Sequence, residues 1–230
     1  MLFSPKNITF GVLLIPGYQW LDAVGPVDYI NSHSHAMMQM PAATESLRAK
    51  APIINWHYIS SEGNFNPISA SAGPPHIPTV NFTSCPPLDY LLIPGPALSA
   101  RLYEECSSFI HERFSTLKGL LTVCTGSIYF AQSGLLDGVH VASNKVALKY
   151  LVETGRLNRK VKWVGDKRFV RDGKIWSSAG ITSGLDLAAE FARVHFDPEL
   201  VDFARNLTEY DSNPAQPDPF APILDGVDLD

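Results

Sequence analysis

The side chain with the clearest chemical potential stands where an apolar run breaks off. The run 119–123 ends at Cys124, and Thr125, Gly126 and an apolar helical pattern follow. This order predicts a buried strand that enters a helix through a tight turn, which lifts the thiol out of the sheet. The first-turn amides of a helix lack internal partners and favour a nearby negative charge. Cys124 is therefore a candidate nucleophile, although a cysteine in this setting is also commonly a small buried apolar residue.

An acidic side chain and a glycine turn are expected near that thiol. The apolar run 8–15 ends in a Pro-Gly turn, and Asp22 follows beside the start of a helical pattern. The apolar run 88–93 ends in a second Pro-Gly turn at Gly95. Both runs have the composition of parallel strands buried on both faces. Since ligands bind at the carboxyl ends of such strands, we expect Asp22, Gly95 and Cys124 at one edge of a sheet.

Strand and helix patterns alternate along most of the chain. Strands are predicted over 53–60, 139–143, 161–164 and, as a hairpin with an Asp-Gly turn, 169–178; helices are predicted over 20–30, 101–114, 126–134, 144–154, 185–196 and 198–210. Segment 31–52 is interpreted as a helix tail and a loop, and segment 68–80 as an edge hairpin. The alternation predicts an α/β fold with a mostly parallel central sheet and helices on both faces.

Composition limits the classes of partner. The 230 residues carry a formal net charge of -5 without a cluster of lysine and arginine, which argues against nucleic acid. The three cysteines have neither the spacing of a metal site nor the even number of a disulfide framework. No signal peptide or membrane-spanning stretch is recognised, so a cytoplasmic location is expected. His33 and His35 supply too few ligands, and no metal site is predicted.

One α/β domain is expected over 1–210, followed by a tail over 211–230. The tail is rich in proline and aspartate and shows little periodicity. It is interpreted as a surface-draped or disordered end, in which Phe220, Ile223 and Leu224 can dock on a neighbouring part of the molecule.

Four motifs occur in order along residues 8–210. The first is the strand and turn 10–17 with Leu-Asp-x-x-Gly-Pro at 21–26, and the second is the strand and turn 89–95. The third is Val-Cys-Thr-Gly-Ser at 123–127 with Gly-Leu-Leu-Asp-Gly at 134–138. The fourth is Gly-Lys-Ile-Trp-Ser-Ser-Ala-Gly-Ile-Thr-Ser-Gly-Leu-Asp at 173–186. Each motif is weak alone. Jointly they resemble the ThiJ/PfpI family, a relative of class I glutamine amidotransferase domains, and within it the isonitrile hydratase-like branch.

The resemblance implies a flavodoxin-like three-layer α/β/α sandwich with a nucleophile elbow, assembled as a homodimer. In this branch a cysteine, a threonine and an aspartate of the motifs carry the catalysis, and they correspond to Cys124, Thr125 and Asp22. The candidates for substrate binding or an oxyanion hole are Gly95, Gly17, Tyr18 and Asn144. The implied partner is a small-molecule substrate, with no cofactor, metal, nucleic acid or membrane.

Two positions depart from the family pattern. The deglycase and glyoxalase branch uses a glutamate, and often a histidine after the next strand, where this chain has Asp22 and Asn144. Without that histidine the thiol depends on the helix terminus and on Asp22, whose pKa burial would raise. Pro96 stands where the family often has glycine, so an oxyanion hole is left to the amides of Gly95 and Thr125.

Several functions are compatible with these residues. The favoured one is a hydratase in which Cys124 attacks an isonitrile or a similar small C=N or C=O compound and Asp22 moves protons, releasing an N-substituted formamide. A tailoring enzyme of secondary metabolism would use the same residues on another substrate. Glyoxalase or deglycase activity lacks its glutamate and histidine. A redox or stress sensor would instead rely on an exposed thiolate of low pKa at Cys124.

Overall fold

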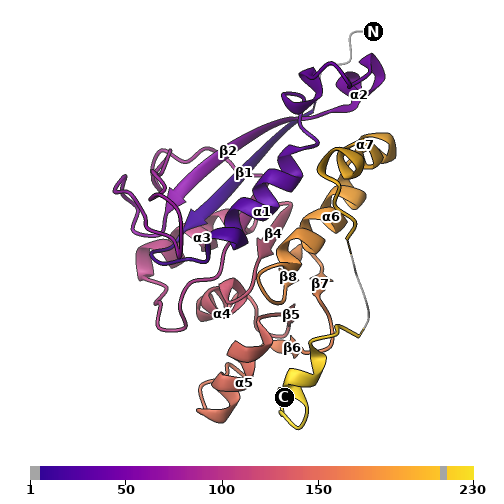
Figure 1. Ribbon diagram of the computed structural model, residues 1–230. Coiled ribbons are helices and arrows are strands. Elements are labelled where there is room, and N and C mark those ends of the chain that lie inside the picture. The colour runs from indigo at the N-terminus through magenta and orange to yellow at the C-terminus, as the bar shows by residue number, and fades with distance from the viewer. Residues whose placement is uncertain (1–5, 213–216) are drawn as a thin grey trace.

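A six-stranded sheet forms the middle layer of the molecule (Figure 1). The computed structural model describes residues 6–212 and 217–230. In spatial order the strands are β2 (Ile53–Ser60), β1 (Asn7–Leu14), β3 (Tyr90–Ile93), β4 (Gly119–Thr122), β8 (Ile175–Ser178) and β7 (Phe169–Asp172). Within this sheet β7 alone runs antiparallel, in the predicted hairpin with β8. The predicted α/β fold with a mostly parallel sheet is confirmed.

The strand order creates a crevice at one edge of the sheet. The chain runs from β1 outward to β2 and then returns past β1 to β3, so the direction of winding reverses between β1 and β3. In open α/β sheets, ligands bind where the order reverses, outside the carboxyl ends of the strands. Every residue of β3, β4 and β8 is buried, as is typical of parallel strands covered on both faces.

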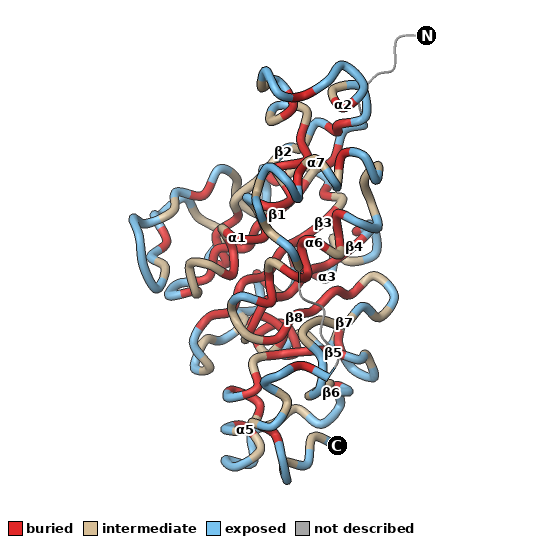
Figure 2. Tube along the Cα trace, turned by 45° about the vertical axis from the view of Figure 1, so that its right-hand side comes forward, coloured by how far each residue is buried: buried red, intermediate tan, exposed pale blue. Residues whose placement is uncertain are grey.

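Helices cover both faces of this sheet. The helices α1 (Trp20–Asn31) and α6 (Ser183–His195) pack together on one face, and α3 (Glu104–Phe114) lies on the other (Figure 1). The remaining helices are α4 (Gly126–Phe130) with the 3-10 turn η2 (Ala131–Ser133), α5 (Lys145–Glu153) and α7 (Pro198–Thr208). Buried residues follow the sheet and the helix faces turned toward it (Figure 2).

The strands predicted at 139–143 and 161–164 form, but they do not join the main sheet. They are β5 (His140–Ala142) and β6 (Lys162–Val164), which pair with each other in parallel beside β7 and β8. The main-chain amide of Ala142 donates to Ser177 Oγ of β8 at 2.9 Å, so β5 is held by a side chain there. This placement brings the start of α5 to the carboxyl end of β8.

The interpretation of segment 31–52 as a helix tail and a loop is corrected beyond its first residues. The segment contains the 3-10 turn η1 (Met37–Gln39) and the short helix α2 (Glu45–Lys50), which is capped by the Thr44 hydroxyl. Together with α7 they form a small second core that includes Met38 and Leu47. A helix of six residues is too short to show an apolar period in the sequence.

The predicted edge hairpin over 68–80 is not a regular hairpin. Ile68 and His76 form a single antiparallel bridge, whereas Val80 pairs in parallel with Ile59 and Ala70 with Tyr18. Prolines at 74, 75 and 78 lack the amide hydrogens that a continuous ladder needs. The segment therefore lies along the ends of β1 and β2 as a loop with isolated contacts.

The described part of the tail docks on the molecule. Asp218 and Leu224 are buried, Phe220 is exposed, and the 3-10 turn η3 (Ala221–Leu224) packs against α5. The expected division into a domain over 1–210 and a tail over 211–230 stays a prediction, and residues 1–5 and 213–216 lie outside the described residues. In the part of the chain that the structure describes, every helix is too short or too polar to cross a membrane.

Candidate active site

Cys124 lies on a strained turn at the carboxyl edge of the sheet. Its φ angle is 56°, in the left-handed region that costs a non-glycine residue about 1–3 kcal/mol. Its amide donates to the carbonyl of Ser178 at 3.2 Å, and the amide of Val123 donates to that of Ile93 at 3.1 Å, so the turn is held between β3 and β8. A side chain at Gly126 would collide with the Ile93 carbonyl. The predicted elbow is therefore present.

Asp22, in the first turn of α1, is fully buried beside this elbow. Its Oδ2 accepts a hydrogen bond from the Gly95 amide at 3.0 Å. Its Oδ1 has no regular hydrogen bond within the described residues, and the Cys124 thiol interacts with the carboxyl group. Burial raises the pKa of Asp22 to about 7, against the smaller lowering effects of the Gly95 amide and the thiol.

The Cys124 thiol is protonated in its resting state. Its exposed fraction is 6%, and burial together with the negative charge of Asp22 raises its pKa to about 12. The amide and hydroxyl of Thr125 and the side chain of Asn144 hydrogen-bond the sulfur and lower this pKa by less. Burial and the neighbouring carboxyl group oppose the thiolate that the helix terminus was expected to stabilise, and α4 has only five residues.

The Gly95 amide has a different role from the one predicted. It was a candidate donor of an oxyanion hole, but it already donates to Asp22. The Gly95 carbonyl in turn accepts from the Gln19 amide at 2.8 Å, so the turns after β1 and β3 hold each other. A Cβ at Gly95 would lie 2.8 Å from both Asp22 Oδ2 and Thr125 N. The structure thus requires glycine here to position the carboxyl group against the elbow.

Thr125 and Asn144 contact the thiol from two other sides. The Thr125 hydroxyl donates to the Pro96 carbonyl at 2.7 Å, and its amide faces the sulfur. Asn144 caps α5, since its Oδ1 accepts from the Ala147 amide at 3.0 Å. Because Oδ1 of Asn144 already accepts this hydrogen bond, the amide nitrogen of Asn144 is the end that interacts with the sulfur. An amide donates a hydrogen bond at this place but cannot take up a proton, as a histidine could.

Gly17 and Tyr18 lie in the same turn region but hold the loop over 61–84. Gly17 adopts a φ of 74° and its amide donates to Ser69 at 2.8 Å. The buried Tyr18 hydroxyl hydrogen-bonds His76, and burial raises its pKa to about 12. Among the described residues, no contact joins Tyr18 to the thiol. A role for these two residues in substrate binding stays a prediction.

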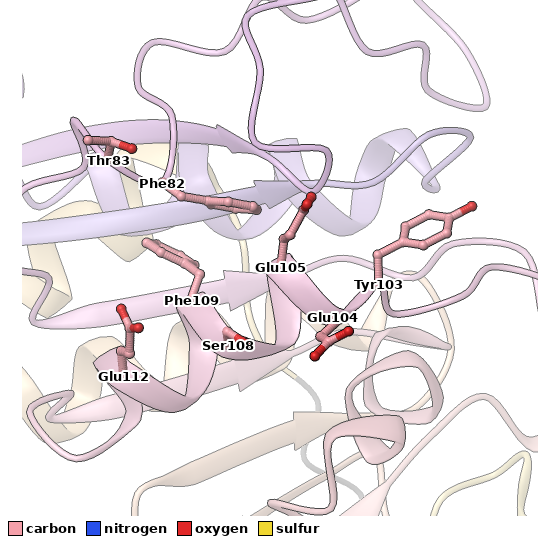
Figure 3. Close-up of a pocket in the computed structure, with 8 residues that line it drawn as sticks. All are labelled: Phe82, Thr83, Tyr103, Glu104, Glu105, Ser108, Phe109 and Glu112. Carbon is pink, nitrogen blue, oxygen red and sulfur yellow. The ribbon is translucent and has the colours of Figure 1, made fainter.

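A pocket of about 830 Å³ lies away from this site. It lies between α3 and the loop around Phe82, with Glu104, Glu105 and Glu112 along it (Figure 3). None of the predicted site residues lines it. Over the described residues, no three His, Cys, Asp or Glu side chains gather as a metal ion would need. His33 is buried and bonds the Tyr29 carbonyl at 3.0 Å, rather than being exposed as expected.

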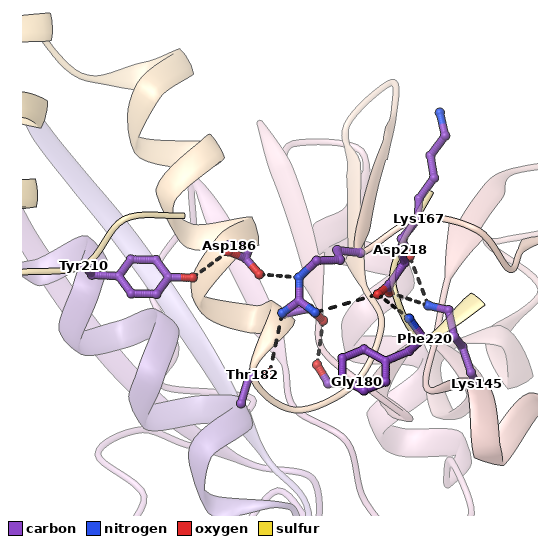
Figure 4. A network of polar contacts seen from close by, with 10 residues as sticks. Lys145, Lys167, Gly180, Thr182, Asp186, Tyr210, Asp218 and Phe220 are labelled. Atoms are coloured by element: carbon purple, nitrogen blue, oxygen red, sulfur yellow. Dashed lines mark hydrogen bonds and ion pairs between the residues drawn. The ribbon is translucent and has the colours of Figure 1, made fainter. Parts of the chain in front are cut away.

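A buried polar network next to the site was missed by sequence reasoning. Lys145 Nζ pairs with Asp218 at 2.7 Å, and Arg168 Nε pairs with Asp186 at 2.6 Å (Figure 4). The Tyr210 hydroxyl also donates to Asp186, at 2.5 Å. The partners of Asp218 are far away in the sequence, so no local pattern signals them.

Sheet order, elbow and carboxyl group define an α/β protein with a buried cysteine on a strand-to-helix elbow. A model of the DJ-1/PfpI family matches residues 11–194, so the chain belongs to that family. The resemblance to ThiJ/PfpI proteins that the four motifs predicted is thereby confirmed.

Relatives with known names agree with this assignment. The chain is 29% identical over 188 residues to the isonitrile hydratase of Pseudomonas putida, covering 81% of this chain and 71% of that protein. Among solved structures, a ThiJ/PfpI family protein from Pseudomonas syringae superimposes with a TM-score of 0.70 at 24% identity, over 93% of this chain and 78% of that one. DJ-1beta of Drosophila melanogaster gives a TM-score of 0.67 at 16% identity, over 90% of this chain and all of that one. The structural likenesses show a shared fold.

Proposed function

We propose that this protein is a cysteine-dependent hydratase that converts an isonitrile to an N-substituted formamide. The observation that carries the proposal is the pair formed by the elbow thiol of Cys124 and the buried carboxyl group of Asp22 with a pKa of about 7. A group with that pKa both accepts and returns a proton near neutral pH. The similarity to an isonitrile hydratase supports the substrate class.

In the first half of the reaction, the thiol adds across the terminal carbon of the isonitrile. Sγ forms a bond to that carbon while ionised Asp22 accepts the thiol proton and then delivers it to the same carbon. The product is a thioimidate, with a C–S single bond and a C=N double bond. Thr125 and Asn144 hydrogen-bond the sulfur and stabilise the negative charge that develops on it during attack.

In the second half, water replaces the sulfur. Asp22 accepts one proton from water as the water oxygen bonds to the thioimidate carbon, and it passes this proton to the substrate nitrogen. The C–S bond then breaks, the carbon–oxygen double bond forms, and the remaining proton returns to Sγ. The sum is one water added to the isonitrile, and Cys124 and Asp22 regain their starting states.

The alternatives weighed on the sequence fit the structure less well. A sensor that oxidises easily needs an exposed thiolate of low pKa, whereas Cys124 is buried and its pKa is raised. A glyoxalase or deglycase would need a residue that takes up a proton where Asn144 lies. A tailoring enzyme acting on another C=N compound uses the same chemistry and differs only in the substrate.

The test is to add cyclohexyl isocyanide and measure N-cyclohexylformamide by mass spectrometry. Cys124→Ser and Asp22→Asn are each expected to lower kcat by at least about 100-fold, because each removes the nucleophile or the proton carrier. In water enriched in ¹⁸O, the formamide oxygen is expected to carry the label.

Asp28→Asn is the matched control, because Asp28 lies exposed on the same helix as Asp22. It is expected to keep wild-type turnover. Thermal unfolding is expected to show that Asp22→Asn is folded, since asparagine removes a buried ionisable group. Turnover retained by Asp22→Asn would sink the assignment of the proton carrier.

A further inference from the structure

A cavity of about 300 Å³ opens beside the elbow. It is lined by residues from the start of α5, from the segment 180–182 and from the docked tail. Its volume is at the lower end of the ~300–1,000 Å³ typical of sites for small molecules. None of the chemistry described so far uses this space.

The cavity shares a wall with the reacting thiol. Asn144 lines it and also hydrogen-bonds the sulfur of Cys124. Gly180, which lines it as well, is two residues beyond Ser178, whose carbonyl accepts from the Cys124 amide at 3.2 Å. The cavity and the thiol are therefore neighbours, with the Asn144 side chain between them.

The docked tail forms the opposite wall. Asp218 is anchored by Lys145 at 2.7 Å, and its amide donates to the Asp166 carbonyl at 2.6 Å. Leu224 lies so close to Gly165 that a Cβ there would come within 2.8 Å of Leu224 Cδ1. These contacts fix the position of Phe220, which is 55% exposed and lies over the cavity (Figure 4).

Both cations that line the cavity are paired. Lys145 is paired with Asp218, and Arg168 is paired with Asp186 at 2.6 Å and lies 3.8 Å from Asp218. Among the described residues that line the cavity, each cation thus already lies beside a carboxylate. The other large side chains at the cavity are apolar: Val146, Ile181, Phe220 and Ile223.

We propose that this cavity receives the nitrogen substituent of the substrate, that the substituent is apolar, and that Phe220 and Ile223 of the tail set its size. The inference rests on the proposed function and specifies its substrate class as isonitriles with an aliphatic or aromatic group. An exposed phenyl ring loses contact with water when such a group binds, which favours binding. A charged substituent would lose its hydration without gaining a partner.

Three isocyanides of different substituent test the proposal: methyl isocyanide, cyclohexyl isocyanide and isocyanoacetate. The wild-type protein is expected to prefer the cyclohexyl compound in kcat/KM and to turn over isocyanoacetate poorly. Phe220→Ala is expected to lower kcat/KM about tenfold or more for the cyclohexyl compound and about twofold or less for the methyl compound. Phe65→Ala, which truncates a similarly exposed phenyl ring at 51%, is the matched control and is expected to change neither.

A binding measurement separates this proposal from the hydratase proposal. N-cyclohexylformamide is expected to bind more tightly than N-methylformamide by calorimetry, and Phe220→Ala is expected to remove the difference. If binding follows this pattern but no isocyanide is hydrated, the proposed function fails and the apolar cavity stands. If hydration proceeds and Phe220→Ala affects all substrates alike, or isocyanoacetate is preferred, the cavity assignment is overturned and the hydratase stands.

Discussion

At the scale of single residues, Cys124 and Asp22 act as one titrating unit. Both pKa values are raised by burial, and the charge of either group disfavours the charge of the other. The resting state near neutral pH therefore keeps the thiol protonated and Asp22 partly ionised. In the proposed mechanism the nucleophile forms only when Asp22 accepts the thiol proton during attack, which ties reactivity to the arrival of substrate.

This coupling predicts the pH dependence of the reaction. Asp22 must be ionised to accept the thiol proton, so kcat/KM is expected to rise with pH through about 7 and to level off above it. No decline from thiol ionisation is expected below about pH 10, because the pKa of Cys124 is about 12. Initial rates of formamide release between pH 5 and 10 measure both features, and the ordinary pKa values of exposed side chains serve as the reference.

Two outcomes would contradict this account. A profile that rises with the ordinary pKa of an exposed aspartate would show that burial does not control Asp22. A profile that rises through the ordinary range of a thiol would show that a preformed thiolate attacks. Asp28→Asn, measured in parallel, is expected to reproduce the wild-type curve.

The sequence pointed to Cys124 and Asp22 as candidates but not to their hydrogen bonds. Cys124 follows β4 and Asp22 lies in the helix that follows β1, so chain order alone places them at the same edge of the sheet. The commitment of the Gly95 amide to Asp22 depends on how two turns approach one another. The double role of Asn144, with its oxygen on α5 and its nitrogen on the sulfur, likewise depends on tertiary placement.

At the scale of elements, one ion pair fastens the tail to α5. Lys145 and Asp218 have exposed side-chain fractions of 3% and 1% and are separated by 73 residues in the sequence. The prediction that Leu224 can dock agrees with the structure, in which Leu224 is buried. Its anchor could not be foreseen, because an aspartate among prolines is typical of an exposed tail.

Lys145→Met is expected to loosen the tail. It leaves the Asp218 carboxylate buried without its lysine, a change that costs about 3–5 kcal/mol if the charge stays in place. Undocking of the tail is the cheaper response, so faster limited proteolysis beyond residue 210 and a Tm several degrees lower are expected. Digestion followed by mass spectrometry locates the cleavage.

Two further variants make this measurement specific. Lys149→Met changes a lysine on the same helix that has no ion pair among the described contacts, and it is expected to behave like the wild type. Lys145→Met combined with Asp218→Asn removes both charges and is expected to be less labile than Lys145→Met alone. Equal digestion of all three variants would show that the pair does not anchor the tail.

At the scale of the whole molecule, the sheet order brings distant segments to a single crevice. The Pro-Gly endings of the first and third strands predicted this convergence, and the reversal between β1 and β3 explains it. The separate pairing of β5 with β6 and the helices within 31–52 were not predictable from local periodicity. Those elements are short, and partners remote in sequence decide where they pair.

An apolar hollow of about 630 Å³ marks a second face of the molecule. It lies between α1, β2 and the start of α6, and Leu21, Val24 and Leu185 are among its lining residues. Leu21 and Val24 lie in neither hydrophobic core and are only half-buried, so part of their apolar surface faces the hollow. Apolar patches of this kind on a protein surface mark interaction sites. The homodimer expected from the family resemblance would bury this face.

Val24→Arg is therefore expected to produce a monomer. The wild-type protein is expected to sediment at micromolar concentration with twice the chain mass of 25.2 kDa, and the variant with the single mass, because a dimer would bury the two arginines without partners. Ile77→Arg adds the same charge at a site that is 67% exposed and is expected to leave the dimer intact. A wild-type monomer would refute the dimer, and a dimeric Val24→Arg variant would move the interface elsewhere. Since α1 also carries Asp22, loss of the dimer is expected to lower turnover through the position of this helix, which formamide assays on the same samples measure.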